Sequence, residues 1–485
     1  MAPSAISDDR VSFTTFHNVI NNQLRSSKIT TQGVNPTTGE TLWDVPVATE
    51  ADFNEAVLAA RKAFPSWSKT PIEERKRMVS QWNDVYASYE KEFTDLIVKE
   101  CGKPRMFGNA EVKMTQNFIM HHTTLDLPTE TLELEKETVK TRYVPLGIVG
   151  AICPWNFPLV LSAGKISPAL VTGNCIIVKP SPFTPYTALK LCEIAMDIFP
   201  PGVFQVLGGD EKLGPWMTAH PDIQKISFTG SIATGKHIMA ACAKTLKRVT
   251  LELGGNDASI VCQDVDIAST APMLVMGAFY NSGQVCVATK RIYIHQDIYE
   301  PMVKAMADFA KTLKVGGDEE GVMVGPIQNS MQHERVAGFF DEGKKQGWNY
   351  AVGGKLETVL NGKGYFITPT IVDNPPSDSR IIQEEPFGPI VPTQPWTDEA
   401  EVIARANDTN TGLGACVWSK DLARAERIAE QLEAGSVWVN SFEQPVPQAA
   451  FGGFKESGIG AEWGSQGLTS YCNVQAIHLY KGPCM

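Results

Sequence analysis

One stretch of the chain decides the fold class: residues 146–180 read LGIVGAICPWNFPLVLSAGKISPALVTGNCIIVKP. The stretch opens with an apolar, β-branched run at 146–152, continues with helical spacing, and closes with a second β-branched run at 175–178. Further runs of this kind lie at 203–207, 225–228 and 248–251. Strands that alternate with helical segments predict a parallel, doubly wound α/β sheet.

The segments on either side carry other patterns. Thr and Glu alternate with Leu and Val between 125 and 143, which predicts an antiparallel hairpin. A second α/β region is expected from about residue 258, and a short final strand at 476–480. No strand-like run leads into residues 458–460, so we expect a loop there.

An early helix pair is expected upstream of the sheet. Thr70 and Glu73 form a capping-box pattern, and Pro71 lies at the first helical position. The amphipathic run that follows extends to about residue 98, so its role is packing.

The composition is that of a globular protein that acts on small molecules. The chain has 485 residues, 43% of them hydrophobic, and a formal charge of −11. This length predicts two or three domains. The basic residues are dispersed, so we expect neither nucleic-acid binding nor a polybasic membrane anchor. No apolar stretch reaches the roughly 18 residues that a membrane span requires.

The ten cysteines predict a reducing compartment rather than a disulfide framework. They lie far apart and form no C-x-x-C pair, so we expect reduced thiols and a soluble, cytoplasmic protein. Residues 1–9 lack the basic and apolar regions of a signal peptide. His121 and His122 are adjacent and would point in different directions on a helix, so no metal site is expected.

Three segments place polar groups where predicted strands end, which is where open α/β sheets bind ligands. Asn156 lies between two prolines in PWNFP (154–158), and its amide could donate to a developing negative charge. FTGS (228–231) leads into a helix whose free N–H groups suit a pyrophosphate. Glu252 begins ELGG (252–255) and could act as a general base.

Two further segments supply a thiol and carboxylates. Cys286 ends GQVC (283–286), and EEPFGP (384–389) is a rigid loop whose carboxylates could bind ribose hydroxyls. Each of the five segments also has a structural explanation when it is taken alone: a rigid turn, a solvated strand end, a buried cysteine or a charged surface turn.

Together and in this order, PWNFP, FTGS, ELGG, GQVC and EEPFGP resemble the signature set of the aldehyde dehydrogenase superfamily. The resemblance extends from about residue 35 to about residue 480. It implies a Rossmann-like cofactor domain, a second α/β catalytic domain and a small β oligomerisation arm. We place these at 1–124 with 147–254, at 255–450, and at 125–146 with 470–485, respectively.

The resemblance also implies roles for individual residues. Cys286 would be the nucleophile, Glu252 the base for hydrolytic water, and Asn156 with the Cys286 backbone N–H the oxyanion hole. Lys165 would lie near the proton path from Glu252. The implied cofactor-binding residues are Ile152, Trp155, Lys179, Ser181, Gly209, Phe228, Gly230, Ser231, Leu253, Glu385 and Phe387.

The expected reaction is the NAD(P)-dependent oxidation of an aldehyde to a carboxylic acid through a cysteine thiohemiacetal and thioester. Because Glu252 is retained, the chain resembles the hydrolytic branch rather than the CoA-acylating one. Pro182 stands where many NAD-preferring members carry a Glu for the ribose 2′-hydroxyl. NADP therefore remains open beside NAD, with a slight preference for NAD.

The expected substrate pocket is apolar. Its walls would be Phe157, Leu161, Val285 and Val287, which favours an aromatic or medium-chain aldehyde. Gly164 stands where many members have a Trp, so a wide entrance is expected. By the same resemblance, the protein would be a homodimer or homotetramer.

Two alternatives of other classes stay open at this point. One is a catalytically silent scaffold that binds a dinucleotide, against which the intact Cys286, Glu252 and Asn156 argue. The other is a cysteine hydrolase that pairs Cys286 with His295. Nine residues along a strand would separate that pair too widely for contact.

Overall fold

The computed structural model describes residues 11–356 and 362–482, and its largest sheet has eight strands. Their order is β2-β1-β9-β8-β7-β10-β11-β23. The five parallel strands are β7 (Ile148–Ile152), β8 (Cys175–Lys179), β9 (Phe204–Val206), β10 (Lys225–Thr229) and β11 (Arg248–Glu252). All five lie where the sequence pattern predicts strands, so the doubly wound α/β sheet is confirmed.

Antiparallel strands close both edges of this sheet. The hairpin of β1 (Asn18–Ile20) and β2 (Gln23–Arg25) pairs with β9, and β23 (Gly458–Ile459) pairs with β11. The expectation of a loop at 458–460 is therefore wrong for its first two residues. The pairing partners of β23 are Leu251 and Glu252, so the local sequence pattern could not reveal this strand.

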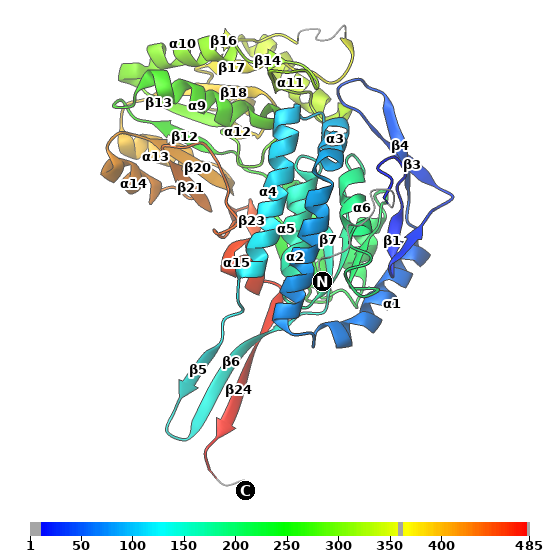
Figure 1. Ribbon diagram of the computed structural model, residues 1–485. Coiled ribbons are helices and arrows are strands. Elements are labelled where there is room, and N and C mark those ends of the chain that lie inside the picture. The colour runs from blue at the N-terminus through cyan, green and yellow to red at the C-terminus, as the bar shows by residue number, and fades with distance from the viewer. Residues whose placement is uncertain (1–10, 357–361, 483–485) are drawn as a thin grey trace.

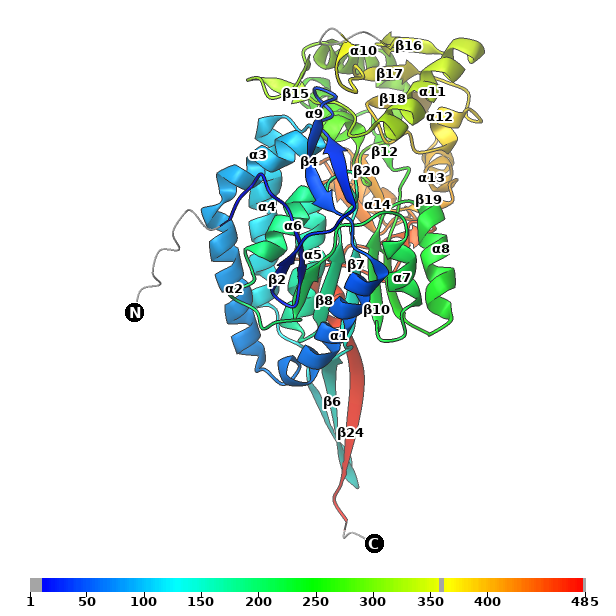
Figure 2. The same ribbon diagram turned by 90° about the vertical axis from the view of Figure 1, so that its right-hand side faces the viewer.

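Helices cover both faces of the sheet (Figures 1 and 2). They are α1 (Glu50–Trp67), α2 (Ile72–Ser88), α3 (Glu90–Cys101), α4 (Arg105–Thr124), α5 (Pro158–Val171), α6 (Tyr186–Glu193), α7 (Leu213–Ala219) and α8 (Ile232–Ala243). Every residue of α5 is buried, because α2 and α4 cover the side of α5 that faces away from the sheet. No described helix is both long and apolar enough to cross a bilayer.

The early helix pair forms, but its start differs from the capping box that the sequence predicts. Pro71 is the N-cap of α2, and no side chain caps this helix. The helical run is also divided, because Tyr89 has a φ of −109° and a ψ of 24°, which ends α2 and starts α3. The apolar periodicity continues across this residue and so concealed the break.

A second sheet of seven strands forms the other α/β unit, in the order β16-β17-β18-β13-β12-β20-β21. Its strands are β12 (Ala258–Val261), β13 (Arg291–His295), β16 (Asn349–Val352), β17 (Thr370–Asp373), β18 (Ile390–Trp396), β20 (Gly414–Trp418) and β21 (Ser436–Val439). Its helices are α9 (Ile267–Phe279), α10 (Tyr299–Ala310), α11 (Ser330–Gln346), α12 (Arg380–Gln383), α13 (Glu399–Asn407) and α14 (Leu422–Ala429). All neighbours except the edge strand β16 pair in parallel.

A three-stranded antiparallel arm projects from the body (Figures 1 and 2). It consists of β5 (Glu130–Glu133), β6 (Glu137–Pro145) and β24 (Cys472–Tyr480). The predicted hairpin and the predicted final strand both lie in it, although β24 begins before residue 476. Small remaining elements are β3 (Thr30–Val34), β4 (Thr41–Pro46), β14 (Lys314–Val315), β15 (Val322–Val324), β19 (Thr411–Gly412), β22 (Phe454–Lys455) and α15 (Gly464–Thr469).

Candidate active site

Three of the five segments meet at one edge of the large sheet. PWNFP follows β7, FTGS closes β10 and ELGG closes β11, and these strands are parallel neighbours in the order β7-β10-β11. The carboxyl ends of parallel strands share an edge, so the three segments lie side by side. Three predicted cofactor residues at this edge are buried: Ile152 at the end of β7, Phe228 in FTGS and Leu253 in ELGG.

A strained turn carries Cys286 to this edge. Asn281 and Ser282 have φ values of 49° and 57°, in the left-handed region that residues other than glycine rarely adopt. The Asn156 amide donates to the carbonyl of Gln284 at 3.0 Å, and the Asn281 amide donates to the carbonyl of Asn156 at 3.3 Å. These bonds fix Asn156 against the turn, and the second N–H of its amide remains available to a ligand.

Cys286 differs from the other cysteines in exposure. It is partly exposed, whereas the other eight cysteines of the described residues are buried. Burial of the thiol and the Glu385 carboxylate nevertheless raise the pKa of Cys286, against the opposing effect of the Lys290 ammonium, to about 12. The thiol is thus neutral at pH 7 and needs local help to ionise.

Glu252 ends β11 with its side chain buried. Neither of its carboxylate oxygens has a hydrogen-bond partner within the described part of the chain. Burial raises the pKa of Glu252 well above the usual value; the Glu462 carboxylate adds to this shift and the Lys165 ammonium opposes it. A buried carboxylate without partners is costly, and a bound water would satisfy it.

Lys165 and Glu462 form a buried ion pair behind Glu252. The Lys165 ammonium lies 2.5 Å from the Glu462 carboxylate and donates to the Ser227 hydroxyl at 3.2 Å. Sequence reasoning identified Lys165 but missed Glu462. Glu462 comes shortly after a Gly-rich segment at 451–458, FGGFKESG, and this position was the sequence signal that could have identified it.

The turn between β10 and α8 has the form that suits a pyrophosphate. Ser231 caps α8 by accepting a hydrogen bond from the backbone N–H of Thr234 at 3.3 Å. At Gly230, a Cβ would lie 2.4 Å from the Phe228 ring, so a side chain would not fit there. The first-turn N–H groups of α8 that Ser231 does not cap have no partner within the helix and suit an anion.

The remaining predicted cofactor residues surround the same edge. Lys179 ends β8 and is largely buried, and burial lowers the pKa of its ammonium. The Ser181 hydroxyl accepts a bond from the Phe183 backbone N–H at 3.3 Å, and Gly209 is buried against Leu213.

The loop at 384–389 also reaches this edge. The rings of Trp155 and Phe387 are in edge contact, with centroids 5.4 Å apart. A Cβ on Gly254 would lie 2.6 Å from a Glu385 oxygen, so this carboxylate lies directly beside ELGG.

An apolar cluster surrounds Cys286. The four predicted wall residues, Phe157, Leu161, Val285 and Val287, all belong to it. Its other members, apart from Cys286 itself, are Met114, Phe118, Val160, Tyr280, Leu413, Trp438, Phe451 and Trp463.

The wide entrance expected from Gly164 is wrong, because another indole occupies the space. A Cβ on Gly164 would lie 2.8 Å from Nε1 of Trp463. Trp463 is buried with a φ of 58°, and its ring packs against Phe118 and Phe451 at centroid distances of 4.8 Å and 4.6 Å. Trp463 is distant in sequence from Gly164, so the sequence did not reveal this compensation.

We expect Gly164 and Trp463 to behave as a coupled pair. Gly164→Trp should lower the midpoint temperature of unfolding, because overpacking a core typically costs about 1–3 kcal/mol. Adding Trp463→Ala should recover part of the lost midpoint temperature, because removal of the indole frees the space that the new tryptophan needs. Thermal unfolding monitored by circular dichroism measures both effects.

Gly214→Trp is the matched control, because an added Cβ at Gly214 meets nothing within 4 Å. Equal losses from Gly164→Trp with and without Trp463→Ala would contradict the pairing.

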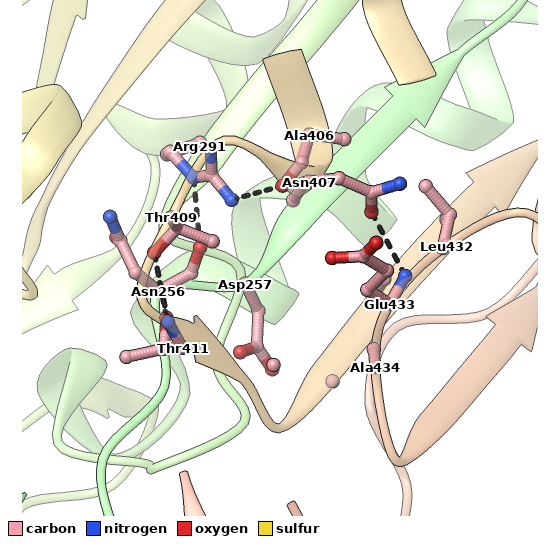
Figure 3. Close-up of a pocket in the computed structure, with 14 residues that line it drawn as sticks. Asn256, Asp257, Arg291, Ala406, Asn407, Thr409, Thr411, Leu432, Glu433 and Ala434 are labelled. Atoms are coloured by element: carbon pink, nitrogen blue, oxygen red, sulfur yellow. Dashed lines mark hydrogen bonds between the residues drawn. The ribbon is translucent and has the colours of Figure 1, made fainter. Parts of the chain in front are cut away.

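The cavity of Figure 3 is lined by none of the catalytic, cofactor or pocket-wall residues predicted from the sequence. Asn256, Asp257, Arg291 and Glu433 are among the residues that line it. Arg291 donates to the carbonyls of Asn256, Arg405 and Ala406 at 2.8–3.0 Å. These bonds occupy its guanidinium, so we assign this arginine to packing.

His295, the partner considered for a cysteine hydrolase, has other contacts. Its ring packs on Trp396 at 4.7 Å, and it accepts a bond from the Asp297 backbone N–H at 3.3 Å. The geometry therefore gives no support to a Cys286–His295 pair.

Comparison with known proteins agrees with this site. The aldehyde dehydrogenase family model matches residues 24–477. The putative aldehyde dehydrogenase FUS7 of Gibberella fujikuroi is 46% identical over 473 residues, which cover 97% of this chain and 100% of that protein. Phenylacetaldehyde dehydrogenase of Pseudomonas fluorescens is 37% identical over 459 residues, 91% of each chain. The NAD+ complex of aldehyde dehydrogenase from Bacillus cereus has a TM-score of 0.93 and 35% identity, covering 96% of this chain and 97% of that one.

The chain therefore belongs to the aldehyde dehydrogenase family. It is an NAD(P)-dependent enzyme that oxidises an aldehyde, as the sequence predicts. A silent scaffold and a cysteine hydrolase are correspondingly disfavoured.

Proposed function

We propose that this enzyme oxidises an aromatic or medium-chain aldehyde to the carboxylic acid through a thioester on Cys286. One observation carries the proposal. Cys286 is the partly exposed thiol among the described cysteines, and its turn is hydrogen-bonded to Asn156 at the sheet edge where β11 ends with Glu252. A nucleophile, an amide donor and a base come from distant parts of the chain to one place.

Attack on the aldehyde begins with ionisation of the thiol. The Cys286 thiolate adds to the carbonyl carbon, a C–S bond forms, and the carbonyl electrons move to oxygen. The free N–H of the Asn156 amide and the Cys286 backbone N–H stabilise this thiohemiacetal oxyanion. A donor of this kind typically contributes about 10²–10³ in rate.

The oxidation and hydrolysis steps follow. A bound nicotinamide dinucleotide supplies the acceptor for the hydride that leaves the substrate carbon. Glu252 then takes a proton from a water molecule that attacks the thioester, and the C–S bond breaks to release the acid and the Cys286 thiolate, which takes up a proton from solvent. Lys165 and Glu462 form an ion pair whose charges act on Glu252, so they would lie near the path of this proton.

The residues of the sheet edge fit a dinucleotide. Gly230 and Ser231 would hold the pyrophosphate at the start of α8, and Lys179 the adenosine ribose. Glu385 would bind the nicotinamide ribose, with Phe387 and Trp155 beside the ring. The fit rests on the N-terminus of α8 beside Gly230 and Ser231, and on the Glu385 carboxylate, which lies against Gly254 of ELGG.

Pro182 bears on the choice between NAD and NADP. Pro182 itself carries no carboxylate, which removes one source of repulsion for a 2′-phosphate, while the Asp210 carboxylate acts on the neighbouring Lys179. We propose that both cofactors are used, with a slight preference for NAD.

The remaining assignments concern the domains and the assembly. We propose that 1–124 with 147–254 bind the dinucleotide and that 255–450 complete the catalytic unit. The arm at 125–146 and 470–485 would pair subunits into a homodimer or homotetramer. Its exposed Leu132, Val474 and Tyr480 support a covering partner. We also propose a cytoplasmic location.

We expect aldehydes to rank by the polarity of their tails. Phenylacetaldehyde and hexanal should give higher kcat/KM than succinic semialdehyde, because Phe157, Leu161 and Val287 are apolar. Absorbance of the reduced nicotinamide, followed with NAD and with NADP, measures this ranking. Highest kcat/KM for succinic semialdehyde would refute the proposed substrate class, and no reduction with any aldehyde would refute the proposed mechanism.

A further inference from the structure

Lys290 is a buried cation in the segment that joins Cys286 to β13. Its side chain is only 1% exposed. The ammonium donates to the carbonyl of Val285 at 2.6 Å, and the carbonyl of Ala288 lies 3.4 Å away. These two residues flank the Cys286–Val287 pair, so Lys290 closes the turn that carries the thiol.

The same ammonium also reaches the loop at 384–389. It forms an ion pair with the Glu385 carboxylate at 3.3 Å and lies 5.5 Å from the centre of the Phe387 ring. Lys290 thereby connects the turn of the proposed nucleophile to the loop proposed to hold the nicotinamide ribose.

Burial of a lysine needs an explanation, because removing an ammonium from water is costly unless it is fully compensated. Two carbonyl oxygens and one carboxylate compensate the buried charge of Lys290. An apolar side chain could pack in this turn without the cost of removing a charge from water. The positive charge itself is therefore the feature to explain.

The charges around the thiol indicate what this charge does. Glu385, Asp257 and Glu252 act on Cys286 and disfavour its thiolate, whereas Lys290 favours it. Asp257 is buried and Glu385 is partly buried, and removal from water raises the pKa of each, with Lys290 opposing the shift. Lys290 thus supplies a positive charge that offsets the carboxylates around the Cys286 thiol.

We propose that Lys290 is a positioning residue, whose ammonium fixes the Cys286 turn against Glu385 and keeps one positive charge beside the proposed nucleophile. Its importance in turnover rests on the proposed role of Cys286, whereas its effect on ionisation of the thiol does not. Removal of the charge should make the Cys286 thiolate rarer at any given pH below the pKa of the thiol.

Alkylation by iodoacetamide, without aldehyde or cofactor, tests the charge directly. The thiolate attacks the reagent, forming a C–S bond and expelling iodide, so the rate follows the thiolate fraction. Mass spectrometry of the Cys286 peptide gives the rate, measured from pH 7 to pH 10. The four proteins are the wild type, Glu385→Gln, Glu385→Gln with Lys290→Met, and Glu385→Gln with Lys290→Arg.

The Glu385→Gln background isolates the lysine, because it removes the carboxylate whose own protonation would otherwise change. We expect Glu385→Gln to react about tenfold faster than the wild type at a fixed pH, since an opposing charge is gone. Lys290→Met in this background should then slow the reaction about tenfold, and Lys290→Arg should leave it nearly as fast as Glu385→Gln alone.

Two outcomes would overturn the inference. If Lys290→Met reacts as fast as its Glu385→Gln parent, the charge has no effect on the thiol. If Lys290→Met and Lys290→Arg slow the reaction equally, the positive charge does not account for the effect and the shape of the lysine side chain does. Lys290→Gln replaces the methionine variant if that variant does not fold, as judged by circular dichroism. The proposed function fails separately, if Cys286→Ala still oxidises aldehydes.

Discussion

Cys286→Ala is expected to abolish aldehyde-dependent reduction of the cofactor, with a loss of about 10⁴-fold or more in kcat. Alanine removes the sulfur that forms the C–S bond and leaves the backbone N–H in place. Without the thiohemiacetal, no carbon centre is prepared to release hydride. The measurement is steady-state absorbance of the reduced nicotinamide at saturating aldehyde.

Cys262→Ala is the matched control for this variant. Cys262 is a fully buried thiol just after β12, in the same α/β unit as Cys286, and we expect its removal to leave kcat near the wild-type value. Turnover by Cys286→Ala at the rate of this control would exclude covalent catalysis at Cys286. Loss of turnover in both variants would indicate damage to the fold instead.

Glu252→Gln should separate the two halves of the reaction. The amide keeps the shape of the side chain but cannot take a proton from water, so the thioester forms and then persists. Rapid mixing should record a burst of about one reduced cofactor per site, followed by a steady-state rate about 10²–10⁴-fold below wild type. Linear progress at the wild-type rate, without a burst, would contradict the role of Glu252.

The pH dependence of turnover gives a second test of Glu252 as the base. The base acts in its deprotonated form, and burial raises the pKa of Glu252 well above the usual carboxyl value. Hydrolysis of the thioester should therefore slow as the pH falls through that raised pKa. Glu252→Gln should lack this limb of the profile.

Much of the fold followed from local patterns. The five parallel strands lie where β-branched runs alternate with helical segments, and parallel neighbours bring their carboxyl ends to one edge. Asn156 and Glu252 were therefore expected at strand ends, and their joint roles in one site followed from the resemblance to the aldehyde dehydrogenase superfamily. The arm was also predicted, because alternation in its hairpin differs from the buried runs of the sheet.

Features that depend on distant pairing were not predicted. The edge strand β23 has only two residues and exists through its pairing with β11. Trp463 occupies the space beside Gly164, and Glu462 pairs with Lys165 across the fold. Lys290 resembles any surface lysine in the sequence, and only its burial beside Glu385 distinguishes it.

The central claim is a covalent bond between substrate and Cys286. Its most direct test is to mix Glu252→Gln with phenylacetaldehyde and the cofactor, quench in acid, and measure the mass of the Cys286 peptide. We predict one acyl group on Cys286 at about one equivalent per chain, absent when the cofactor is left out. An unmodified Cys286 peptide in a sample that has reduced one equivalent of cofactor would contradict the account.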